Sequence, residues 1–148
     1  MIEILFRGKR IDNGEWIEGY YVKTVDYLND SAVHLIIESP STFYPRGEIA
    51  GEYEVIFSTV GQYTGLTDKN GRKIFEGDVL NVHDQIPMFD GYDTDEIVYN
   101  GKVMYIKNQG MYVCEGNNDG NALCALDLGK CEVIGNIHDN PELLGADE

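Results

Sequence analysis

The chain has 148 residues, enough for one domain with a sizeable core or for two small β modules. Its 26 acidic and 11 basic residues give a formal net charge of −15, which opposes non-specific binding to nucleic acid or to an anionic membrane surface. No apolar run approaches the ~20 residues of a membrane helix, and the amino terminus lacks the apolar core of a signal peptide. We therefore expect a soluble protein of the cytoplasm.

The composition favours strands over helices. Gly is abundant at 17 residues, Pro is scarce at four, and Tyr is the commonest aromatic residue at ten. Short strands punctuated by Gly, Asn and Asp turns have this mixture. We predict a mostly β fold of antiparallel hairpins and a meander, with minimal helix. Cys114, Cys124 and Cys131 lack CxxC spacing, so we expect reduced thiols rather than a disulfide framework or a zinc site.

The first elements in the chain are expected to form a hairpin. Alternating apolar residues at Ile2 to Phe6 predict the first strand, and the Asn13-Gly14 pair predicts the turn before a strand at Trp16 to Val22. Between them lies the one dense basic cluster, Arg7, Lys9 and Arg10. This cluster is either a contact for a phosphate or an acidic partner or, more commonly in proteins, a solvated strand end that neutralises nearby acids.

The next segments mark a candidate boundary. Lys23 to Ser31 is polar and predicts a loop, whereas Ala32 to Glu38 predicts a buried strand in which His34 is a hydrogen-bonded structural residue. Ser39 to Glu52 is rich in Pro and Gly, as connections between elements are. We expect a single domain over residues 1–148, with possible subdomains at 1–52 and 53–148.

The central stretch, Val60 to Leu80, reads VGQYTGLTDKNGRKIFEGDVL and predicts a hairpin that turns at Asn70 and Gly71. Together with the opening ILFRGKRIDNGEWIEGYYV and the closing EVIGNIHDNPELL, it closely resembles the YopX family of phage and prophage proteins. The three blocks occur in the family's order and frame nearly the whole chain. The resemblance implies family membership and a phage or prophage origin, and it brings no reaction, ligand or catalytic residue with it.

An acidic segment follows the central hairpin. Asp84 to Glu96 contains five acids and no basic residue, so we expect a mobile insertion that is dispensable for folding. The alternative, a calcium cage, lacks the spacing of an EF-hand loop. Within the segment, Tyr92 is a candidate partner contact, and the tyrosines that follow it in the chain are candidates for the same binding face: Tyr99, Tyr105 and Tyr112.

The last part of the chain predicts a meander. Ile97 to Lys107 is expected to form two runs around a turn at Asn100-Gly101, followed by strands at Met111 to Cys114 and at Glu132 to Ile137. Ala122 to Leu128 is ambiguous between strand and helical turn, and Asn140-Pro141 predicts a short helical turn. By analogy of pattern, this C-terminal part resembles a small SH3-like barrel.

No catalytic constellation is visible in the sequence. The histidines, His34, His83 and His138, lie far apart without motif context, and the nucleophile, phosphate-loop and metalloprotease motifs are missing. We expect no enzymatic activity, no cofactor and no metal. The favoured function is a non-catalytic module that binds a host or phage protein, with no direct nucleic-acid binding; the alternatives are a DNA-mimicking inhibitor and a structural homo-oligomer.

Overall fold

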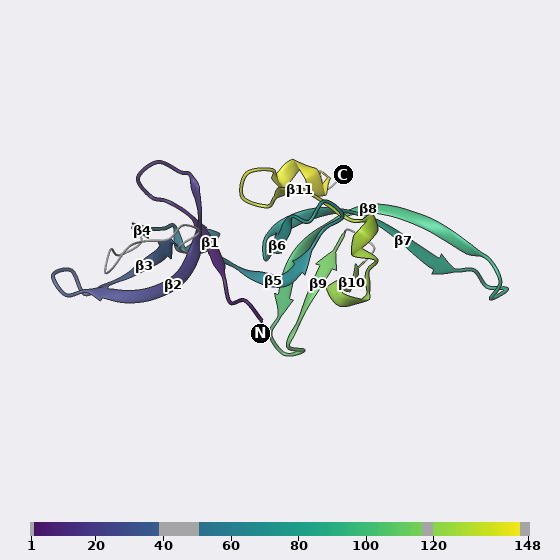
Figure 1. The fold of residues 1–148 in the computed structure, drawn as a ribbon, viewed down its shortest axis with the longest axis horizontal. Helices are drawn as coiled ribbons and strands as arrows, with labels where there is room; N and C mark the ends of the chain where they lie inside the picture. The colour runs from purple at the N-terminus through teal and green to yellow at the C-terminus, as the bar shows by residue number, and fades with distance from the viewer. Residues whose placement is uncertain (1, 39–50, 117–119, 146–148) are drawn as a thin grey trace. The chain divides into compact units, whose positions relative to one another are not determined.

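The structure is a computed structural model that describes residues 2–38, 51–116 and 120–145. Its strands form two antiparallel sheets, and its helices are single 3-10 turns (Figure 1). The fold is therefore mostly β, as predicted. The strands are β1 (Phe6–Lys9), β2 (Trp16–Asp26), β3 (Ser31–Glu38), β4 (Glu52–Glu54), β5 (Gly61–Thr67), β6 (Lys73–Phe75), β7 (Asp78–Pro87), β8 (Thr94–Ile106), β9 (Met111–Glu115), β10 (Gly120–Ala122) and β11 (Glu132–Asn136).

The chain divides into two compact units, Met1–Tyr63 and Thr64–Glu148, and β5 runs from the first into the second. The sequence suggested a division after residue 52, but β4 pairs with β3 and the turn η1 (Phe57–Thr59) follows it inside the first unit. Most of the Pro- and Gly-rich segment from Ser39 to Glu52 lies outside the described residues.

In the first unit β1 is a central strand, flanked by β2 and β5. The core consists of Ile17, Ile36 and Val55. The predicted strand at Ile2 to Phe6 was wrong in its position: Ile2 is 81% exposed, and the strand begins at Phe6. The β1–β2 hairpin was predicted correctly, and Gly14 has the positive φ of 72° that its turn requires.

The β2–β3 hairpin is longer than the sequence indicated. The two strands pair from Gly19↔Glu38 to Asp26↔Ser31, so the predicted loop at Lys23 to Ser31 was wrong except for the turn of residues 27–30. Cross-strand pairing overrode the polar composition of the outer part of β2. The Tyr21 hydroxyl lies 2.6 Å from His34 Nδ1, so the hydrogen bond that the sequence predicts for His34 is confirmed.

In the second unit the hairpin turn at Asn70-Gly71 is confirmed. The Gly71 N–H donates to the Asp68 carbonyl and the Asp68 N–H donates to the Arg72 carbonyl, at 3.0 and 2.9 Å. Gly71 has φ +76°, whereas Asn70 has a negative φ. Among the described residues, the one non-glycine residue with a positive φ is Asp30. Asn70 therefore does not take the left-handed conformation of a primed turn, and the connection is a type I turn closed by a left-handed glycine.

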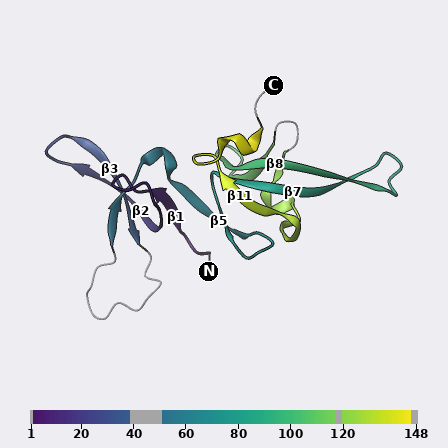
Figure 2. The ribbon, with the colours of Figure 1, turned by 90° about the horizontal axis from the view of Figure 1, so that it is seen from above.

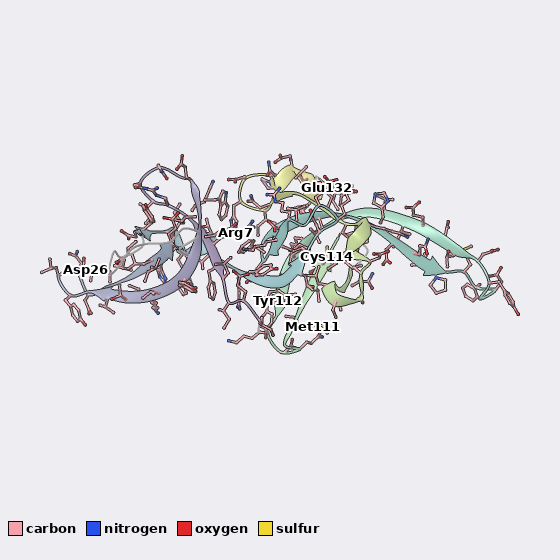
Figure 3. All side chains as sticks on the ribbon, in the orientation of Figure 1. Arg7, Asp26, Met111, Tyr112, Cys114 and Glu132 are labelled. Atoms are coloured by element: carbon pink, nitrogen blue, oxygen red, sulfur yellow. The ribbon has the colours of Figure 1, made fainter. Side chains whose placement is uncertain are left out.

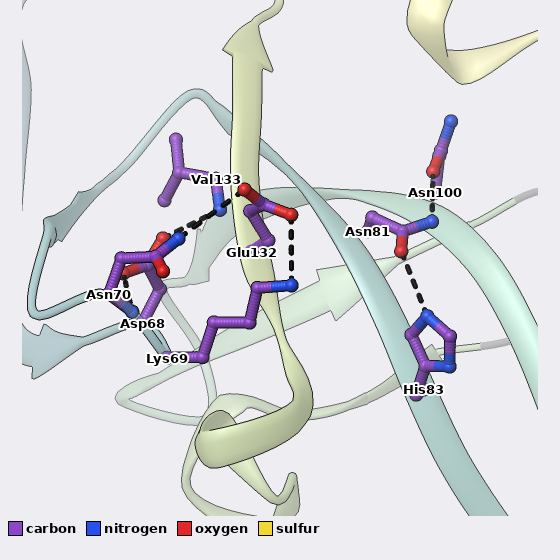
Figure 4. A network of polar contacts seen from close by, with 8 residues as sticks. All are labelled: Asp68, Lys69, Asn70, Asn81, His83, Asn100, Glu132 and Val133. Atoms are coloured by element: carbon purple, nitrogen blue, oxygen red, sulfur yellow. Dashed lines mark hydrogen bonds and ion pairs between the residues drawn. The ribbon is translucent and has the colours of Figure 1, made fainter.

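The Asp68 side chain fastens this turn to the edge strand β11. Its carboxylate accepts from the backbone N–H groups of Asn70 and Val133 (Figure 4) and from that of Arg72, each at 2.9 Å. Burial by itself would raise the pKa of the Asp68 carboxyl, but the three backbone donors outweigh it and hold the pKa below its usual value. Lys69 adds an exposed ion pair with Glu132 at 3.1 Å.

The second sheet has the order β10-β9-β8-β7-β11 and is open rather than a closed barrel in the described residues. One face of the β7 and β8 strands contributes to a core that includes Leu80, Val82 and Val103. The predicted turn at Asn100-Gly101 was wrong, because both residues lie inside the continuous strand β8. Gly101 is buried there: a Cβ at this position would approach the Cys114 sulfur to 2.6 Å.

The C-terminal elements are short. The ambiguous stretch at Ala122 to Leu128 begins as the last residue of β10 and continues as two 3-10 turns, η2 (Leu123–Ala125) and η3 (Leu128–Lys130). The predicted strand at Glu132 to Ile137 is confirmed as β11. A final turn, η4 (Pro141–Leu144), begins after Asn140 with Pro at its first position, as expected.

Candidate interaction surface

The outer half of the β7–β8 hairpin continues past the strands that flank it. β11 pairs with β7 only as far as Asn81, and β9 pairs with β8 only from Lys102 onward. Residues 82–101 therefore form a two-stranded ribbon, which we call the arm, with a register from Val82↔Tyr99 to Pro87↔Thr94 (Figure 2). The predicted mobile insertion at Asp84 to Glu96 was wrong for its ends, which are paired strand, and only residues 88–93 form the turn.

The tip of the arm exposes large apolar side chains. Phe89 and Tyr92 are 112% and 94% exposed, and Ile86 and Met88 are partly exposed beside them. The side chains along the outer ribbon project to both sides of it (Figure 3). Apolar side chains gathered on a protruding element, rather than scattered singly, are typical of protein interaction sites. The tip is thus available for contact.

Polar contacts of the backbone hold the tip in shape without a core. The Met88 N–H donates to the Asp93 carbonyl at 2.8 Å, and the Asp90 carboxylate accepts from the N–H groups of Tyr92 and Asp93. The two hydrogen bonds to its carboxylate lower the pKa of Asp90, and the one from the Tyr92 N–H has the larger effect. The aromatic residues are therefore presented on a defined turn, which reduces the conformational entropy lost on binding.

The arm is uniformly acidic. Apart from His83, its charged residues are five acids, and the sequence places no Lys or Arg between Val82 and Gly101: the acids are Asp84, Asp90, Asp93, Asp95 and Glu96. Asp84 is held by the Asn121 amide at 2.8 Å. Within residues 2–38, 51–116 and 120–145, no three His, Cys, Asp or Glu side chains converge on a site for a metal ion.

A chain of side-chain hydrogen bonds crosses the base of the arm on the face away from the core. The Asn100 amide donates to the Leu143 carbonyl at 2.8 Å, and the Asn81 amide donates to Asn100 Oδ1 at 3.0 Å (Figure 4). His83 Nε2 lies 3.1 Å from Asn81 Oδ1, and His83 Nδ1 lies 2.9 Å from Glu96 Oε1. The arm is thereby connected to the C-terminal turn.

The basic cluster lies in the first unit and agrees only in part with the solvated strand end, neutralising nearby acids, that the sequence favoured. Arg7 is only 8% exposed because it sits in the central strand β1, and its guanidinium carbon lies 4.9 Å from the centre of the Trp16 ring. The Lys9 ammonium lies 5.7 Å from the same ring. Arg10 is paired with Asp12 and stacks on Tyr53 at 4.0 Å. Aromatic and acidic neighbours thus already engage all three cations.

The predicted tyrosine face separates into exposed and packed residues. Tyr99 and Tyr112 pack against the core of the second unit, and burial raises the pKa of Tyr99 to about 12. Tyr105 is 43% exposed and lies 5.1 Å from the Tyr112 ring, so Tyr92 is the most accessible of the four. Sequence reasoning did not single out the exposed Phe89 beside Tyr92, although an aromatic residue in an acid-rich stretch was a visible signal.

Comparisons with known proteins agree with this fold. A family model described as YopX protein matches residues 5–145. The chain is also similar to the crystal structure of protein EF1440 from Enterococcus faecalis, with 26% identity over 97% of this chain and 99% of that one, and a TM-score of 0.51. None of the curated proteins matches significantly. Among the described residues, no helix has the length and apolar character needed to span a membrane.

Proposed function

Because the chain belongs to the YopX family, we propose that it is a phage or prophage accessory protein that acts without catalysis, binding another macromolecule through the arm. The observation that carries the proposal is the exposed apolar tip on a uniformly acidic ribbon that extends past its flanking strands. In a monomer that made no contact, this exposed apolar surface would have a hydration cost without a compensating benefit.

The chemistry of the arm indicates the kind of partner. Phe89 and Tyr92 are large aromatic side chains of the sort that dominate binding energy when they fill a pocket. The acids around them would steer the arm toward a cationic surface and raise the association rate at low salt. The partner that fits is a protein with an apolar pocket surrounded by Lys and Arg.

A DNA-mimicking inhibitor is a second candidate, favoured by the net charge of −15 and the row of acids along the arm. Such a protein would bind the DNA site of a DNA-processing protein through charge. Its affinity would then fall steeply with salt and depend little on the apolar tip.

The test is affinity purification of the tagged protein from lysogenic or infected host cells, followed by mass spectrometry. A Phe89→Ser/Tyr92→Ser variant should lose the partner and keep the melting temperature, because neither side chain packs in the core. The matched control is Tyr27→Ser/Leu28→Ser, which removes two side chains that are 95% and 93% exposed on the β2–β3 turn. Equal loss in both variants, or a fixed oligomer of this chain with no other partner, would contradict docking through the arm.

Direct binding to nucleic acid is not expected. Duplex binding depends on Lys and Arg that neutralise phosphates, and here Arg7 is nearly buried while Arg10 is already paired with Asp12. We expect no gel shift of DNA or RNA at micromolar protein and low salt. Saturable binding that disappears when Arg7, Lys9 and Arg10 are changed to Ala would overturn this expectation.

A further inference from the structure

The orientation of the amide groups at the base of the arm is fixed by one backbone carbonyl. The Leu143 carbonyl can only accept, so the Asn100 side-chain nitrogen faces it as donor and the Asn100 oxygen faces Asn81. The Asn81 nitrogen must donate to that oxygen. Asn81 therefore presents its own oxygen, an acceptor, to His83 Nε2 at 3.1 Å.

The second ring nitrogen of His83 also faces an acceptor. His83 Nδ1 lies 2.9 Å from Glu96 Oε1, and an ionised carboxylate has no proton to donate. A neutral imidazole carries one N–H and can satisfy one of these contacts, whereas an imidazolium carries two and satisfies both. The geometry thus matches the charged form of His83.

His34 provides an internal comparison. Its Nδ1 faces the Tyr21 hydroxyl at 2.6 Å, a group that donates or accepts equally well. A neutral His34 ring keeps this contact. The requirement for two protons is therefore particular to His83 and does not follow from hydrogen bonding of histidine in general.

We infer that His83 is a proton-dependent latch: its imidazolium joins Glu96 on β8 to the relay Asn81, Asn100 and Leu143, and so ties the arm to the C-terminal turn. Loss of the proton breaks one of the two His83 contacts. The latched state holds the extra proton, so the latch is closed while both ring nitrogens carry protons and opens when a rise in pH removes one of them. Because His83 and Glu96 are 40% and 62% exposed, solvent reaches both groups and protons exchange freely.

The latch also sets the charge of the arm, a consequence that rests on the proposed function. In the latched state His83 neutralises Glu96. Once His83 is neutral, its positive charge no longer offsets Glu96 and the arm carries one more net negative charge. A cationic partner would consequently bind the open arm more tightly.

Other ionisable groups surround the latch and must be accounted for in any titration. On β11, Glu132 lies opposite Asn81 and is already paired with Lys69. The Cys131 thiol stays neutral because burial raises its pKa. Asp84 on β7 is bonded to Asn121. Asp127 caps the turn η3 and Lys130 ends it, Glu142 lies on η4, and His138 and Asp139 lie between β11 and η4.

The test is NMR of the histidine rings and Asn side-chain amides between pH 5 and 8, in the full chain. In the wild type the Asn100 amide signals should shift together with the His83 ring signals, and this coupling should weaken in the Glu96→Gln variant, whose side chain at position 96 carries no charge. His34 should keep its Tyr21 contact throughout. Asn100 signals that do not follow the His83 ring signals, or coupling of the same size in Glu96→Gln, would overturn the latch.

Binding of a deca-lysine peptide separates this inference from the proposed function. Wild type should bind the peptide about two- to fivefold more tightly at the upper end of this pH range than at the lower, the change expected for one exposed ion pair. His83→Gln should reduce that dependence. Binding with the same pH dependence in both proteins would refute the charge effect of the latch, whereas no binding in either would refute the cationic partner and leave the NMR result to decide the latch.

Discussion

Replacing Asp68 with Ala should destabilise the second unit more than any exposed acid does. The change removes the acceptor of three backbone N–H groups and detaches the turn from β11. Asp68 is 6% exposed, so water does not readily replace the lost contact to Val133. A buried donor left without a partner costs about 1–3 kcal/mol. Loss of the local turn contacts adds about 1 kcal/mol, as loss of a helix cap does. We expect a total near 3 kcal/mol.

The assay is urea unfolding followed by circular dichroism, with exchange of the Val133 amide measured by NMR as the local readout. Asp90→Ala is the matched control, because Asp90 also accepts two backbone N–H groups in a turn but lies at the exposed tip of the arm. Stability equal to that of the control, or a Val133 amide that stays protected in Asp68→Ala, would refute the reasoning.

The same site should contribute to acid sensitivity. The pKa of Asp68 is lowered in the folded state, so the unfolded chain binds the proton more tightly. Its contribution is complete above the unfolded pKa, about 3.9 for Asp, and is lost as the pH falls through the lower folded value. Asp68→Asn should remove this part of the loss of stability below about pH 4. An unchanged acid profile in the variant would contradict the assignment.

Three further outcomes follow from the structure. Gly71→Val should cost on the order of 1 kcal/mol or more in urea unfolding, because Gly71 has φ +76°; an unchanged midpoint would contradict the turn geometry. Gly101→Ala should cost about 1–3 kcal/mol by overpacking against the Cys114 sulfur, and Cys114→Ala in the same chain should recover part of the loss. In a thiol-labelling experiment Cys124, which is exposed, should react quickly and Cys114 slowly, since burial raises the pKa of Cys114 to about 12. Equal rates for the two thiols would refute that difference.

Local pattern predicted the elements that depend on neighbours in the sequence. The turns at Gly14 and Gly71, the strand that contains His34 and the helical turn at Pro141 follow from the conformational preferences of Gly, Asn and Pro and from short apolar runs. These preferences act within a few residues, so one sequence contains them. The polar outer ends of β2, β7 and β8 carried no such signal.

Those strand ends exist because of pairing across the hairpins. Enough acidic residues lie in Asp84 to Pro87 and in Thr94 to Glu96 to suggest a mobile loop. The two segments nevertheless belong to the regular antiparallel ladder between β7 and β8. Strand pairing also places Asn100 and Gly101, which the sequence predicts as a turn, in the middle of β8. Gly101 lies there against Cys114 of the neighbouring strand β9.

The sequence by itself determined the class of fold, the family and the acidity of the arm. These follow from composition, from local turn signals and from the order of the sequence motifs, none of which requires contacts between distant residues. Only the tertiary structure decided which side chains the arm exposes and which groups meet at its base. His83, Glu96 and Leu143 are far apart in sequence, and their hydrogen bonds depend on strand register and on where the last turn packs. Register is a long-range property: a shift of one residue would turn His83 to the other face of the sheet and abolish the latch.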